Sequence, residues 1–161
     1  MCSSLWIAFH DDLADPDHED PVRRQSSRLQ CAAVLGAQTS LDPAQVREWT
    51  PNITYGGHAF GFGNFDACLA AREEIQPWID AYSPYHQVSE GDPPVYLRYN
   101  RPPAIGQRER DATHSANYGV MLQRHCEALG VTCDVVYPGA ENIEHQTTTS
   151  YLIHMLTQED E

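Results

Sequence analysis

Two short stretches of the sequence contain residue types that could carry out acid–base chemistry. The segment "DATH" holds Asp111 and His114, and the segment "PGAENIEH" holds Glu141, Glu144 and His145. An imidazole exchanges protons near neutral pH, and a neighbouring carboxylate can orient it. Two carboxylates, such as Asp111 with Glu141 or Glu144, could instead act as the acid and base of glycoside hydrolysis. These five residues are the candidate catalytic groups.

Each candidate also has a purely structural explanation. Asp111 stands at the start of a predicted helix, where an aspartate commonly caps free N–H groups. His145 lies in an acidic turn, where a histidine is commonly a solvated surface residue. The hydroxyls of Ser3, Ser4 and Ser115 and the thiol of Cys2 would act as nucleophiles only with a base within hydrogen-bond reach.

The elements that must position these residues follow a βα pattern. Apolar runs predict strands, and segments with helical periodicity or capping residues lie between and around them. Strands and helices that alternate with short joins favour a parallel sheet, and the fold class is therefore α/β. The helix at 66–82 is expected to break at Pro77. The predicted strands are 29–37, 93–99 and 131–137, adjacent in that order, and the predicted helices are 3–14, 41–50, 66–82, 111–130 and 147–158, the last two on opposite faces of the sheet.

Composition excludes several classes of protein. The 161 residues have a formal net charge of −13, with 23 acidic and 10 basic side chains. This balance leaves no basic surface for nucleic acid or for an anionic membrane. Five cysteines without a C-x-x-C pair favour reduced thiols, and the start of the chain has no basic signal region, so we expect a cytoplasmic protein.

No cofactor or metal site is predicted. The acidic stretch "HDDLADPDHED" lacks the spacing of an EF-hand, so a solvated loop is favoured over a cation site. The glycine-rich stretch "YGGHAFGFGNF" is expected to form a loop, and no Lys-Ser or Lys-Thr follows it, as a phosphate-binding loop would require.

Several motifs after residue 83 appear in an order typical of one enzyme family. "SPYHQVSEGDPPVYLRY" and "LQRHCEALGVTCDVVYPGAENIEH" together resemble the carboxy-terminal half of an α/β hydrolase of the esterase and lipase kind. The resemblance implies that Asp111 is the acid and His145 the base of a catalytic triad, both at the carboxyl end of the sheet. The family spacing would put the histidine at Asn142 instead. The resemblance also implies that Tyr55, His58, Phe60 and Phe62 line a substrate pocket.

The family's nucleophile lies in a G-x-S-x-G turn, and these 161 residues contain no such motif. The resemblance therefore implies one α/β-hydrolase-like domain over 1–161, truncated at its amino end, in which 1–14 follows the missing turn and 41–85 is a pocket insertion. Three functions stay open: an esterase-like hydrolase with residual or recruited activity on a small ester, a glycoside hydrolase acting on a carbohydrate, or a non-catalytic binding module. Truncation would expose the edge of the 29–37 strand and the apolar face of the 3–14 helix, including Trp6 and Phe9. We therefore expect a homodimer through these two elements.

Overall fold

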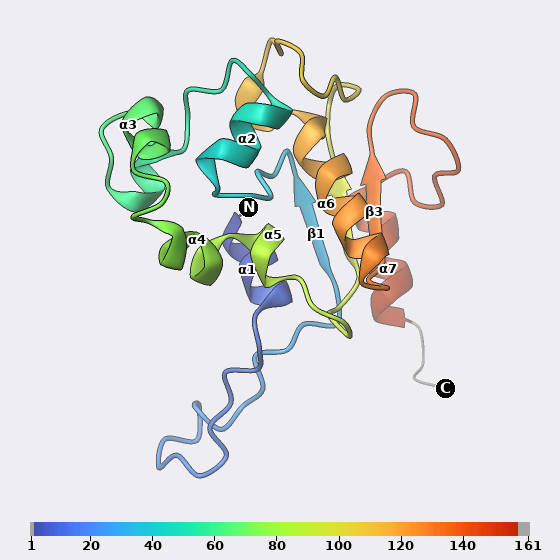
Figure 1. The fold of residues 1–161 in the computed structure, drawn as a ribbon. Coiled ribbons are helices and arrows are strands. Elements are labelled where there is room, and N and C mark those ends of the chain that lie inside the picture. Colours follow the sequence, from blue (N-terminus) through green and yellow to red (C-terminus); the bar gives the residue numbers. More distant parts are fainter. Residues whose placement is uncertain (1, 158–161) are drawn as a thin grey trace.

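A three-stranded parallel sheet forms the centre of the computed structural model, which describes residues 2–157 (Figure 1). β1 (Ala32–Leu35) pairs with β2 (Val95–Arg98), and β2 pairs with β3 (Cys133–Val136). The α/β class and the strand order β1-β2-β3 confirm the prediction. The strands are shorter than predicted because parallel pairing ends where the flanking residues turn away into loops.

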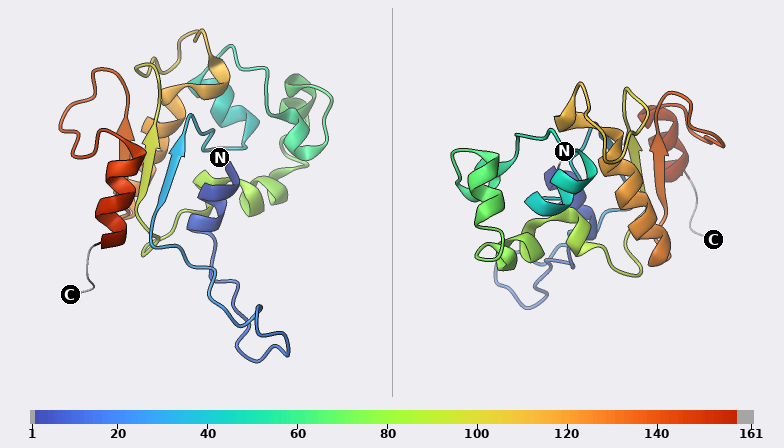
Figure 2. Two further views of the ribbon diagram at one scale, coloured as in Figure 1. Left: turned by 180° about the vertical axis from the view of Figure 1, so that it is seen from behind. Right: turned by 45° about the horizontal axis from the view of Figure 1, so that its top comes forward.

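Helices cover the sheet on both faces. Successive residues of a strand point to opposite faces, so Val95 and Leu97 lie on one side of β2 and Tyr96 on the other. Val95 and Leu97 share a core cluster with Leu122 of α6 (Ala116–Ala128). Tyr96 packs against Tyr151 of α7 (Thr148–Thr157). The ribbon views show α6 and α7 on opposite faces of the sheet (Figure 2). The predicted placement of these two helices on opposite faces is confirmed.

The segment before α6 folds differently from the single helix predicted at 111–130. Asp111 caps a short 3₁₀ turn (Ala112–His114), and Ser115 then caps α6 by accepting a hydrogen bond from the N–H of Asn117. The chain changes direction between the two caps. This break places Asp111 and His114 on a turn of their own at the end of the sheet.

α1 (Cys2–Phe9) packs on the same face of the sheet as α6. It ends at Phe9, just before the acidic run, and Leu5 and Phe9 join the core cluster that contains Val34 of β1. The indole of Trp6 donates a hydrogen bond to the carbonyl of Ala81 at 2.9 Å. The expectation that this helix leaves Phe9 uncovered is therefore wrong, because neighbouring elements of the same chain bury that side chain.

β1 pairs only with β2 within the described part of the chain, so its outer edge offers backbone groups for pairing. Leu35, at its end, is 53% exposed. The homodimer through the 29–37 strand edge and the 3–14 helix stays a prediction.

A set of short helices, the helical segment of residues 42–87, lies to one side of the sheet (Figure 1). Asp42 caps α2 with Pro43 in its first turn, as predicted, and the helix expected at 66–82 breaks just before Pro77. The glycine-rich stretch contains one 3₁₀ turn, and α5 was not predicted. The bounds are α2 (Pro43–Trp49), the 3₁₀ turn (Gly57–Phe60), α3 (Phe65–Ala70), α4 (Gln76–Tyr82) and α5 (Pro84–Gln87).

The ends of two predicted segments, Met1 and residue 158, lie outside the described residues. Over residues 2–157, the structure contains no helix with the length and apolar character needed to cross a bilayer.

Candidate functional site

A carboxylate and an imidazole meet at the carboxyl end of the sheet. His114 Nδ1 lies 3.1 Å from both Oδ1 and Oδ2 of Asp111, and the backbone N–H of His114 also donates to Asp111 Oδ1 at 3.3 Å. The two side chains are about half exposed, at 52% for Asp111 and 48% for His114. The capping role predicted for Asp111 is thus present, and the same turn pairs its carboxylate with His114.

The same contacts set the proton affinity of Asp111. Partial burial acts to raise its pKa, but the hydrogen bond and charge of His114 outweigh that effect, so the pKa of Asp111 is lowered. A carboxylate with a lowered pKa stays ionised at neutral pH. It can therefore hold the imidazole in one orientation and stabilise the imidazolium.

Gly36 lets the loop after β1 approach this histidine. It follows Leu35 with a φ of 54°, a backbone conformation that favours glycine. A Cβ at Gly36 would lie 3.4 Å from side-chain atoms of His114. The end of β1 therefore packs directly against the imidazole.

One hollow borders His114, and a second hollow shares part of its lining. The smaller, of about 220 Å³, is lined by Gly36, Thr113 and His114 together with Cys2, Gln38 and Tyr55. The larger, of about 490 Å³, shares those last three residues and extends along Trp6, His58 and Tyr82. Three residues thus line both hollows, so the two hollows are neighbours.

Two of the four residues expected to line a substrate pocket lie beside the larger hollow. Tyr55 and His58 line the larger hollow, with ring centroids 4.8 Å apart. Phe60 and Phe62 pack instead against the buried cluster of α3 and α4 that contains Ile79. The helical segment gives these two aromatic rings a small core of their own.

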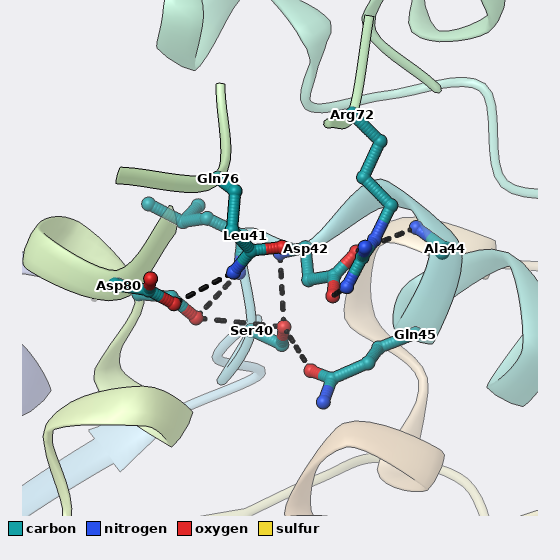
Figure 3. A network of polar contacts seen from close by, with 9 residues as sticks. Ser40, Leu41, Asp42, Ala44, Gln45, Arg72, Gln76 and Asp80 are labelled. Carbon is teal, nitrogen blue, oxygen red and sulfur yellow. Dashed lines mark hydrogen bonds and ion pairs between the residues drawn. The ribbon is translucent and has the colours of Figure 1, made fainter. Parts of the chain in front are cut away.

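An ion pair between Asp42 and Arg72 (Figure 3) holds the loop whose residues Gln38 and Leu41 line the larger hollow. Arg72 Nε and Nη2 donate to the two carboxylate oxygens of Asp42 at 2.8 and 2.6 Å, and the N–H of Leu41 donates to Ser83 Oγ. The side chain of Asp42 is fully buried. These contacts tie the segment that carries Gln38 and Leu41 to the helices around it.

The structure gives His145 other neighbours than Asp111. Tyr96 Oη donates to the carbonyl of His145 at 3.0 Å, and the imidazole packs edge-on against Tyr151. His145 Nε2 lies 3.8 Å from Glu144 Oε1, and its ring centroid lies 4.7 Å from that of His154. This group stands on the α7 face, whereas Asp111 contacts His114.

The two predicted glutamates also lie near His145. Glu141 and Glu144 line a hollow of about 210 Å³ with His145 and Asp134, and no described contact joins either glutamate to Asp111. The family spacing would place a histidine at Asn142, which here adopts a left-handed φ of 55°.

Several residues that line the hollows were not predicted to do so. Cys2, Gln38, Trp6 and Tyr82 line the hollows, and no motif marks them. His154 is different, since it follows Tyr151 by three residues in a segment predicted as helix, and residues at that spacing share one face of a helix. That spacing was the available signal for a histidine beside the sheet.

Comparison with known proteins gives one informative likeness. No protein-family model matches the chain, and no curated protein sequence matches it. An acetyl ester-xyloside bifunctional hydrolase from Caldicellulosiruptor lactoaceticus has a similar structure, with a TM-score of 0.52 and 18% sequence identity over 83% of this chain. The chain spans 40% of the length of that hydrolase. At this identity, the likeness shows that the chain has the fold of part of a hydrolase.

Proposed function

We propose that this protein is a hydrolase-like protein in which Asp111 and His114 act as an acid–base pair on a neutral carboxylic ester. The observation behind this proposal is the 3.1 Å contact between His114 Nδ1 and the Asp111 carboxylate beside a hollow at the carboxyl end of a parallel sheet. Ligands of open α/β folds bind at that end. The likeness to a hydrolase fold supports the same class of reaction.

The pair can promote hydrolysis with water as the nucleophile. His114 Nε2 takes a proton from water as the water oxygen bonds to the ester carbonyl carbon. The tetrahedral intermediate then breaks its bond to the alcohol oxygen, which receives the proton from His114. Asp111 accepts the hydrogen bond from Nδ1–H throughout and stabilises the imidazolium.

Cys2 borders the same hollow but is a poor nucleophile. Burial raises the pKa of its thiol to about 11, so the thiol keeps its proton at neutral pH. The catalytic proposal therefore assigns the attack to water.

The aromatic lining of the larger hollow favours a substrate with a flat or apolar group. Its walls include the aromatic side chains of Trp6, Tyr55 and Tyr82, which offer faces to a sugar ring or an aryl group. The net charge of −13 disfavours an anionic substrate. The C. lactoaceticus protein is described as acting on an acetyl ester and a xyloside, so an acetylated sugar is the substrate class that we propose. In this proposal the 41–85 segment is the pocket insertion of the domain.

Hydrolysis of p-nitrophenyl acetate by the purified protein tests the proposal. General-base catalysis contributes a factor of about 10²–10⁴, so His114→Gln should lower kcat/KM at least about 100-fold, and Asp111→Asn at least about tenfold. His18→Gln, in the loop between α1 and β1, is the matched control and should leave the rate unchanged.

Other outcomes would change the assignment. Loss of activity in His145→Gln with full activity in His114→Gln would identify His145 as the base. Hydrolysis of p-nitrophenyl xyloside alone would favour paired carboxylates on a glycoside, and no hydrolysis of either compound would leave the non-catalytic binding module.

A further inference from the structure

We propose that Glu144, His145 and His154 form a binding site for a divalent transition metal ion of the Zn²⁺ type, which ties the loop after β3 to α7. One ligand atom from each of the three side chains lies within 4.8 Å of the others. No other set of three histidine, cysteine or acidic residues comes as close together within residues 2–157. The site lies on the α7 face of the sheet and is separate from the Asp111–His114 pair.

The two imidazoles determine which cations fit. Zn²⁺ binds imidazole nitrogen at about 2.0–2.1 Å and carboxylate oxygen at a similar distance, so tetrahedral ligands lie about 3.3 Å apart. The present separations need only small side-chain movements to reach that geometry. Ca²⁺ and Mg²⁺ prefer oxygen ligands, so a set of two imidazoles and one carboxylate selects against them.

The structure holds His145 in place before any ion binds. Tyr96 Oη fixes its backbone carbonyl, and Tyr151, stacked on Tyr96 with centroids 5.0 Å apart, supports its ring. The side chain of His145 is only 12% exposed. Contacts of this kind orient a metal ligand and lower the entropy lost on binding.

The third ligand and the surrounding charge favour a cation. The carboxylate of Glu144 is 74% exposed on the loop, so it can rotate toward the two imidazoles. Asp134 and Glu141 line the adjoining hollow of about 210 Å³. A bound cation would relieve this concentration of acidic groups.

Titration calorimetry of the metal-free protein with ZnCl₂ tests the site. We expect one Zn²⁺ per chain, and His145→Ala and His154→Ala should each weaken binding by at least about tenfold. His18→Ala is the matched control in the acidic loop and should bind as the wild type does. MgCl₂ and CaCl₂ should give no saturable binding.

A second measurement covers a variant that folds poorly. Zn²⁺ should raise the Tm of the wild type and of His18→Ala, but not that of His154→Gln, which alters only the end of the site on α7. The absence of Zn²⁺ binding to the wild type would overturn the proposal. So would binding that survives in either His145→Ala or His154→Ala, and so would binding lost in His18→Ala.

Discussion

Two buried aspartates differ in the direction of their pKa shifts. One lies in the helical segment and the other in the sheet half, which consists of β1–β3 with α1, α6 and α7. Asp42 starts the helical segment, and Arg72 and the N–H of Ala44 donate hydrogen bonds to it at 2.6–2.8 Å. Asp92 precedes β2 in the sheet half, where Arg28 Nη1 lies 3.7 Å away and the N–H of Ser89 donates at 2.7 Å. Burial acts to raise both pKa values. At Asp42 the hydrogen bonds reverse that effect, whereas at Asp92 the pKa stays raised.

The difference shows what stabilises each half. Burial of a carboxylate is unfavourable unless aligned charged donors replace its hydration. The helical segment has such a donor in Arg72, so its loop depends on a polar contact. The sheet half depends on the fit of apolar side chains between β1–β3 and the helices on its two faces. Substitutions should therefore destabilise the helical segment mainly by removing polar contacts and the sheet half mainly by disturbing apolar packing.

The largest effect should come from overpacking the sheet half at Gly119. A Cβ on this residue of α6 would lie 2.3 Å from Tyr99 Cε2 and 3.0 Å from Val135 Cγ1, so even one methyl group has no room. We expect Gly119→Ala to lower the free energy of unfolding by about 3 kcal/mol. Urea unfolding followed by circular dichroism measures it.

The same substitution at Gly63 is the matched control in the helical segment. Nothing lies within 4 Å of a Cβ there, and Gly63 is not among the glycines with positive φ. Gly63→Ala should change stability by less than about 0.5 kcal/mol. Equal losses of stability in Gly119→Ala and Gly63→Ala would contradict the conclusion that close packing of side chains matters more in the sheet half than in the helical segment.

The sequence predicted the sheet half well because its signals are local. The apolar runs at 93–99 and 131–137 and the stripe of α6 identify which side chains face the core, and short parallel connections limit the topology. The pairing of Asp111 with His114 was not predicted, because it depends on a 3₁₀ turn between two caps. The group of Glu144, His145 and His154 depends on how the loop folds back onto α7, which is a tertiary contact without a sequence motif.

The next effect should come from removing the donor of the helical segment. Arg72→Met leaves the fully buried carboxylate of Asp42 without its charged partner. Because Arg72 is itself 36% exposed, we expect a loss of about 2–3 kcal/mol at about pH 7, at the low end for a broken buried pair. Urea unfolding gives the difference in the free energy of unfolding. The loop that carries Leu41 beside the larger hollow should also become less ordered.

The pH dependence identifies the cause. A carboxyl group with a lowered pKa contributes stability above its unfolded pKa of about 3.9, and that stability is lost as the pH falls through the folded pKa. The difference in the free energy of unfolding between the wild type and Arg72→Met should therefore become smaller below about pH 4. A difference in unfolding free energy that stays constant with pH would mean that Arg72 acts through packing alone.

The smallest effect, of opposite sign, is expected at Asp92. Its folded pKa is raised, mainly by burial, so its contribution to stability is fully present below the unfolded pKa of about 3.9 and is lost as the pH rises through the folded pKa. At about pH 7 the ionised group is therefore unfavourable in the fold. In Asp92→Asn the amide oxygen can still accept from the N–H of Ser89, and the lost attraction to the half-exposed Arg28 is weak. We expect the stability of this variant to equal or exceed that of the wild type by about 0–1 kcal/mol at about pH 7, and the variant to lose that advantage near pH 3.

Asp42→Asn, the matched variant in the helical segment, should be less stable than the wild type at about pH 7. A loss of more than about 1 kcal/mol in Asp92→Asn would show that Arg28 stabilises Asp92 as Arg72 stabilises Asp42.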